Sequence, residues 1–175
     1  MRKYLLGLVL AVLVCAPASA ETVTLTMPDA QRRFIEVMQD FAARYKAEKN
    51  ELRATKLVAA RFEALEKIPK SAEFSGWYGQ IAKMGTAEGK AWVVVKIKEY
   101  PFTLKTWNNT MSDYKHQSLI SQKSKVFDQL ADLSEGDWVK MSGKVVGEGS
   151  ATERGMMTDP EWIVRFSSID RAVVQ

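Results

Sequence analysis

The second half of the chain contains five short segments in which apolar and polar residues alternate or apolar residues run together. They span residues 74–84, 91–98, 102–107, 138–146 and 161–170. Glycine, proline and asparagine separate them, and such bounded apolar segments are typical of β-strands. We therefore predict five strands between residues 74 and 170.

One helical pattern lies between the third and fourth of these strands. Apolar residues recur at helical spacing along one side of residues 124–133, and Ser124 is suited to be the N-cap. Five strands with one helix in this position are the order of an OB-fold, a small closed barrel. Gly76 and Gly79 within the first strand are expected where the strand bends sharply to close the barrel.

A helical arm is predicted before the barrel, which makes the fold class α+β. Pro69 ends the helical region, because the residue before a proline is disfavoured in helical geometry. The arm is either one helix or two, with Asn50 as the candidate start of the second. The simpler interpretation packs the apolar stripe on the barrel, and the alternative uses it for a partner or for homo-oligomerisation. The stripe comprises Phe34, Met38, Phe41, Tyr45 and Leu52.

The first twenty residues have the order of a secretory signal peptide. Arg2 and Lys3 precede an apolar run over residues 4–14, and small residues at 18–20 form a cleavage site. The run is shorter than the ~20 residues that span a bilayer. Val14 is a poor residue before a lipidated Cys15, so a soluble exported form is favoured over a lipid-anchored one. We predict a signal peptide over 1–20, a helical arm over 21–70, a barrel domain over 71–175 and a periplasmic location.

Signal cleavage changes the charge and the redox chemistry of the chain. The formal charge of +4 falls to +2 because Arg2 and Lys3 are removed. The only cysteine, Cys15, is removed with them, so the mature chain can form no disulfide. A small net charge in an exported protein disfavours nucleic acid as a partner.

The residues for common catalytic and metal chemistries are sparse. A nucleophile triad needs a base beside the nucleophile, and the chain has a single histidine, His116, in a polar loop. Zinc sites draw on several Cys and His ligands. We therefore predict no enzyme activity, no metal and no cofactor. The last loop does contain carboxylates at non-EF-hand spacing, for which a solvated loop is the simpler interpretation: Glu148, Glu153, Asp159 and Glu161.

The second and third strands of OB-folds usually form the binding face. The inward positions here are Val93, Val95, Ile97, Phe102 and Leu104. The positions left for the outer surface are Trp92, Lys96, Lys98, Thr103, Lys105 and Trp107. Lysine beside tryptophan suits single-stranded nucleic acid, because bases stack on rings and phosphates meet cations. Such residues also have structural uses, since lysine blocks edge pairing and tryptophan covers neighbouring elements.

Several short motifs resemble those of a known family. They are Thr106-Trp107-Asn108-Asn109, Ser112-Asp113, Leu119-Ile120, Gly136-Asp137, Arg165-Phe166 and the run from Met157 to Trp162. The chain from about residue 41 to residue 170 resembles exported bacterial proteins of the tRNA-anticodon-domain-like OB-fold family. The resemblance implies an exported or lipid-anchored barrel protein, and it does not imply tRNA binding.

Two of these motifs have both a structural and a functional interpretation. Asn108 and Asn109 can close a turn after Trp107, since asparagine tolerates left-handed geometry. Asp159-Pro160 can set the start of the last strand. The alternative is a recognition surface at the barrel mouth formed by Trp107, Asn108, Asn109 and Asp113.

The leading hypothesis is a non-enzymatic periplasmic OB-fold protein that binds a protein or an envelope component. The alternative is a binder of single-stranded nucleic acid or oligosaccharide, and a weaker one is a carboxylate–metal enzyme. The predicted ligand-binding residues are Trp92, Lys96, Lys98, Lys105, Trp107, Asn108, Asn109 and Asp113.

Overall fold

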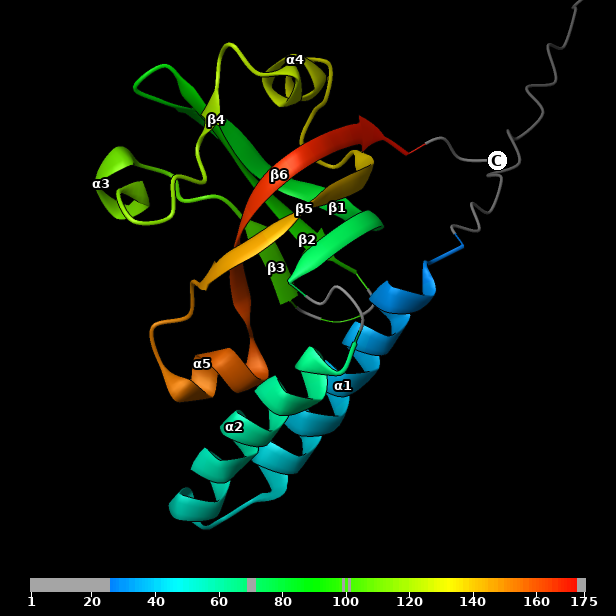
Figure 1. The fold of residues 1–175 in the computed structure, drawn as a ribbon, viewed down its shortest axis with the longest axis vertical. Coiled ribbons are helices and arrows are strands. Elements are labelled where there is room, and N and C mark those ends of the chain that lie inside the picture. Colours follow the sequence, from blue (N-terminus) through cyan, green and yellow to red (C-terminus); the bar gives the residue numbers. More distant parts are fainter. Residues whose placement is uncertain (1–25, 69–71, 99, 101, 173–175) are drawn as a thin grey trace, which may run out of the picture.

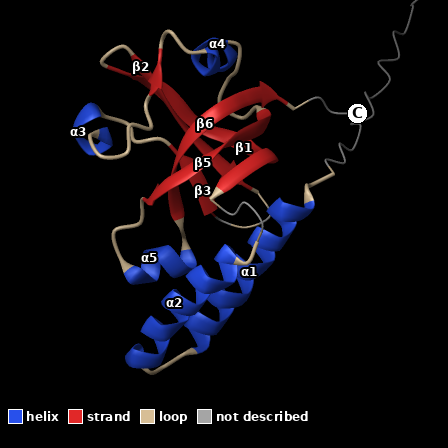
Figure 2. Ribbon diagram, viewed as in Figure 1, coloured by secondary structure: helices blue, strands red, loops and turns tan. Residues whose placement is uncertain are grey.

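The computed structural model describes residues 26–68, 72–98, 100 and 102–172. Two helices precede a closed barrel, and shorter helices lie at both ends of that barrel (Figures 1 and 2). The α+β class and the N-terminal helices before a barrel are as predicted. The predicted signal peptide lies outside the described residues.

The arm consists of two helices, α1 (Asp29–Ala47) and α2 (Glu51–Glu66). Asn50 is the N-cap of α2, because its side chain accepts a hydrogen bond of 3.1 Å from the N–H of Arg53. The new helix start moves Leu52 off the predicted stripe, and Leu52 is 79% exposed. The buried side of α1 consists of Gln31, Phe34, Ile35, Met38, Phe41 and Ala42.

Five strands close into the predicted mixed barrel. Strand β1 (Glu73–Ala87) pairs antiparallel with β2 (Lys90–Ile97) and with β5 (Trp138–Glu148). Strand β3 (Phe102–Lys105) pairs antiparallel with β2 and parallel with β6 (Glu161–Arg171). Strand β6 also pairs antiparallel with β5. A two-residue strand, β4 (Ile120–Ser121), extends the edge of β2.

The two glycines expected at strand bends have identifiable roles in β1. Gly76 has a φ of +67° and lies where the β1–β5 register shifts between Phe74 and Trp77. At Gly79, a Cβ atom would lie 2.6 Å from Cγ1 of Val95. Only glycine therefore fits the close approach of β1 and β2 at this position.

The predicted helix between strands is α4 (Lys125–Ala131), and Ser124 caps it by accepting from the N–H of Phe127 at 3.3 Å. Two further helices, α3 (Thr110–Asp113) and α5 (Glu153–Thr158), occupy segments expected to be loops. They contain four and six residues, which is too short to show an apolar periodicity.

The arm and the barrel share one hydrophobic core. All five predicted inward residues of β2 and β3 are buried. Phe34 of α1 packs against Trp77 and Phe102, with ring centroids 5.1 and 5.4 Å apart. Thr103 was expected on the outer surface but is only 9% exposed, and its N–H donates to the carbonyl of Pro160.

Candidate binding surfaces

The predicted ligand-binding residues do not form one cluster. Asn109 and Asp113 have structural roles in the loop that contains α3. Asn109 caps that helix by accepting from the N–H of Ser112 at 2.8 Å. Asp113 is 4% exposed, and its carboxylate accepts from the N–H and hydroxyl of Ser118 and from the N–H of Leu119. The carboxylate is therefore occupied in holding the loop.

Lys105 at the end of β3 lies beside Trp107 and contacts β6. The Lys105 ammonium is 2.5 Å from a carboxylate oxygen of Glu161 and 5.8 Å from the Trp107 ring centroid. The Trp107 ring in turn lies 6.4 Å from the ring of His116. Because Glu161 neutralises its charge, Lys105 is a weak attractor for an anionic ligand.

Trp92 has a packing role near the tip of the β1–β2 hairpin. Its ring covers Gly85 on β1, where a Cβ atom would lie 2.7 Å from Cζ2 of Trp92. Asn108 is exposed, and its side-chain oxygen accepts from the side-chain amide of Asn109 at 2.9 Å. Neither residue lies beside the pocket that Lys96 and Lys98 line.

Lys96 and Lys98 line a pocket of about 330 Å³ on the outer side of β2 and β3. Gln80 of β1 closes one side, and its side-chain amide is held by a 2.9 Å hydrogen bond to the carbonyl of Gly136. The other lining residues are Ile97, Phe102, Thr103 and Asp159. This position agrees with the binding face expected of an OB-fold.

The outer surface continues from this pocket across β1 to β5. The register places Gln80 between Lys96 and Trp138, and it pairs Tyr78 with Lys140. The Lys98 ammonium lies 5.5 Å from the Trp138 ring centroid, and that of Lys140 lies 5.8 Å from the Tyr78 ring. We name this surface the lysine–aromatic face: Tyr78, Gln80, Lys96, Lys98, Trp138 and Lys140.

The lysine–aromatic face carries more positive than negative charge, although Asp159 lines its pocket and Asp170 of β6 lies opposite Lys140 in the register. Within the described part of the chain, no ion pair involves Lys96, Lys98 or Lys140. The sequence alone did not point to Tyr78, Gln80, Trp138 or Lys140. The alternation of Trp138 and Lys140 with buried Val139 and Met141 indicates that Trp138 and Lys140 lie on an outer face. The alternation does not show which strand pairs with this segment.

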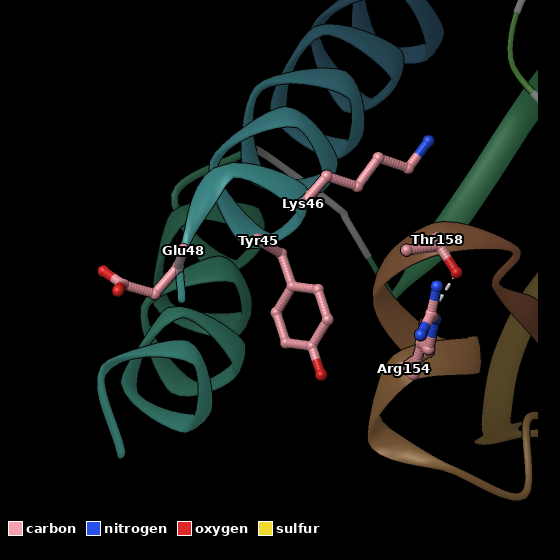
Figure 3. Close-up of a pocket in the computed structure, with 5 residues that line it drawn as sticks. All are labelled: Tyr45, Lys46, Glu48, Arg154 and Thr158. Atoms are coloured by element: carbon pink, nitrogen blue, oxygen red, sulfur yellow. Dashed lines mark hydrogen bonds between the residues drawn. The ribbon is translucent and has the colours of Figure 1, made fainter. Parts of the chain in front are cut away.

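A larger cleft of about 520 Å³ separates α1 from α5 (Figure 3). Tyr45 and Lys46 extend from α1 towards the α5 side, where Arg154 and Thr158 lie, whereas Glu48 points away. Glu48 pairs with Arg53 at 3.2 Å, and the N–H of Asn50 holds the Glu48 pKa below its ordinary value. The cleft thus combines both signs of charge and defines no ligand class.

A buried polar cluster joins α2 to the end of β5. Arg61 is 1% exposed; one nitrogen donates to the carbonyl of Met156, and Nη2 lies 3.9 Å from a carboxylate oxygen of Glu148. Its guanidinium also lies over the rings of Phe62 and Trp162. Burial lowers the pKa of Arg61 and raises that of Glu148, and in each case this effect outweighs their mutual attraction.

Comparisons with known proteins return no match to any family model, curated protein or solved structure. The resemblance to the tRNA-anticodon-domain-like OB-fold family therefore stays a prediction. Over residues 26–68, 72–98, 100 and 102–172, no group of three or more His, Cys, Asp or Glu side chains is arranged to hold a metal ion. No helix in these ranges is long and apolar enough to cross a membrane.

Proposed function

We propose that the protein is a non-enzymatic OB-fold binding protein that holds an acidic protein segment of the cell envelope on its lysine–aromatic face. The observation that carries the proposal is the set of three lysines around a pocket and two rings, none of which forms an ion pair within the described part of the chain. Carboxylates of a partner would supply the missing counter-charges. The signal-peptide pattern of residues 1–20 supports a periplasmic site of action.

The same geometry favours a protein segment over single-stranded nucleic acid. Nucleic-acid binders of this type present open ring faces on which bases stack. Here the Lys98 and Lys140 ammonium groups already lie over the rings of Trp138 and Tyr78.

A titration with a labelled peptide rich in Asp and Glu tests this proposal. We expect the triple variant Lys96→Gln/Lys98→Gln/Lys140→Gln to weaken binding about tenfold or more at low salt, because it removes the unpaired charges. The measurement is fluorescence polarisation, with a lysine-rich peptide and a single-stranded oligonucleotide as comparison ligands. Equal binding by the wild type and the triple variant would overturn the proposal, as would tighter binding of the oligonucleotide than of the acidic peptide.

The control variant removes the same charge elsewhere. Lys46, Lys56 and Lys67 are exposed lysines of the arm, and their replacement by glutamine should change peptide binding by no more than about twofold. An equal loss in both triple variants would show a general effect of net charge. That result would argue against a defined face.

A further inference from the structure

Helix α3 presents two large apolar side chains to solvent. Met111 is 91% exposed and Tyr114 is 89% exposed. They are three residues apart, so they project from the same side of this one-turn helix. The other exposed large apolar residues of the described chain, Leu52 and Phe62, belong to the arm at the opposite end of the molecule (Figure 1).

The loop that carries these side chains is held in place by hydrogen bonds within the loop and to β6. Besides the bonds made by Asn109 and Asp113, the N–H of Trp107 donates to the Ser118 hydroxyl at 2.9 Å. Arg165 on β6 donates to the carbonyl of His116 at 2.7 Å. Met111 and Tyr114 are thus presented on a preformed support, which lowers the entropy cost of inserting them into a partner.

The surroundings of α3 are mainly cationic. Thr110 donates to Glu88 at the β1–β2 turn at 2.7 Å, and Lys90 pairs in register with Ser121 of β4. The hairpin tip, α3 and the β4–α4 turn therefore share one end of the barrel (Figure 1). Exposed lysines without an ion pair among the described residues occur here: Lys90, Lys115, Lys123 and Lys125.

We propose that this end of the barrel docks on the surface of an anionic lipid bilayer. Met111 and Tyr114 would enter the headgroup region, where tyrosine is favoured because its ring is apolar and its hydroxyl is polar. The lysines would face the lipid phosphates. Of the carboxylates nearby, Glu88 is engaged by Thr110, and Asp128 lies on α4 among the lysines.

A lipid surface fits these features better than a protein pocket. The two side chains project from a convex helix and are flanked mainly by lysines, which suits a flat anionic layer. The surface is separate from the lysine–aromatic face, so the inference does not rest on the proposed function. We name it the docking end: Met111, Tyr114, Lys90, Lys115, Lys123 and Lys125.

A fluorescent label at position 111 tests the insertion directly. The arm and the barrel lie within residues 26–172, so a chain beginning at residue 21 keeps both and carries no cysteine. Met111→Cys labelled with an NBD dye should shift to shorter wavelength with phosphatidylglycerol–phosphatidylcholine vesicles. The shift should be much smaller with phosphatidylcholine alone, because the lysines then have no net anionic surface to face. Leu52→Cys, labelled in the same way, should not respond.

Co-sedimentation with the same vesicles tests the side chains themselves. We expect Met111→Ser/Tyr114→Ser to weaken vesicle binding about tenfold and Leu52→Ser to leave it unchanged. The triple glutamine variant of the lysine–aromatic face should keep the NBD shift, which separates this proposal from the proposed function. An unshifted label at position 111, or equal vesicle binding by the Ser variant and the wild type, would overturn it. Capture of a protein through Met111 and Tyr114 without any vesicle response would also overturn it.

Discussion

At the residue scale, Arg61 and Glu148 form an unusual buried pair. Their separation of 3.9 Å is at the limit of an ion pair, and two guanidinium nitrogens of Arg61 have no hydrogen-bond partner among the described residues. Stacking on Phe62 and Trp162 replaces part of the lost hydration. Burial therefore dominates both pKa values, and Glu148 retains its proton to a higher pH than an ordinary glutamate.

This raised pKa predicts a pH-dependent stability. The folded protein holds the Glu148 proton more tightly than the unfolded chain does. The stabilisation is therefore full below the ordinary pKa of 4.5 and is lost as the pH rises through the folded value. We expect the free energy of unfolding of the wild type, relative to Glu148→Gln, to fall as the pH rises through this window and then to level off.

The measurement is urea denaturation of both proteins between about pH 4 and about pH 8. Glu63→Gln, which changes an exposed glutamate of α2, serves as the control. A difference between wild type and Glu148→Gln that stays constant with pH would contradict the raised pKa.

At the element scale, the Asp113 carboxylate makes three of the hydrogen bonds that hold the α3 loop. Asp113→Ala leaves the N–H and hydroxyl of Ser118 and the N–H of Leu119 without their acceptor in a buried site. We expect a loss of about 2–3 kcal/mol in the free energy of unfolding, measured by chemical denaturation. Asp128→Ala, at an exposed position on α4, should cost no more than about 0.5 kcal/mol. Similar losses in the two variants would disprove the structural role of Asp113.

At the scale of the whole molecule, the arm and the barrel form one core. Phe34 is 3% exposed and joins α1 to the rings of Trp77 and Phe102. The apolar side of α1 is buried in the core that it shares with the barrel. An oligomer formed through this side would first require the arm to leave the barrel. The dimerisation alternative considered from the sequence gains no support from this packing.

The shared core predicts that arm and barrel unfold together. We expect Phe34→Ala to lower the free energy of unfolding by about 3–5 kcal/mol while the transition stays single. Helical circular dichroism and tryptophan fluorescence should report the same midpoint in urea. Phe62→Ala, at a position 37% exposed, should cost clearly less. Loss of the helical signal before the fluorescence change would show that the arm is an independent unit.

The sequence by itself determined the five barrel strands, the helix α4 and the order that defines the barrel. Alternation along a strand and helical periodicity are local properties, so residues such as Val93, Val95 and Ile97 could be assigned to the core from the sequence alone. The N-cap at Ser124 was predictable for the same reason. Pairing between distant strands is not encoded in such patterns.

Only the tertiary structure decided which lysines remain available for binding. Pairing of β1 with β5 placed Trp138 and Lys140 beside Tyr78 and Gln80, although the paired residues Tyr78 and Lys140 are 62 positions apart in the sequence. Parallel pairing of β3 with β6 brought Glu161 beside Lys105, and the Glu161 carboxylate neutralises the charge of Lys105. The charge of an exposed face depends on the neighbours that the fold supplies, because a carboxylate in direct contact with a lysine weakens the attraction of that lysine for an anionic ligand.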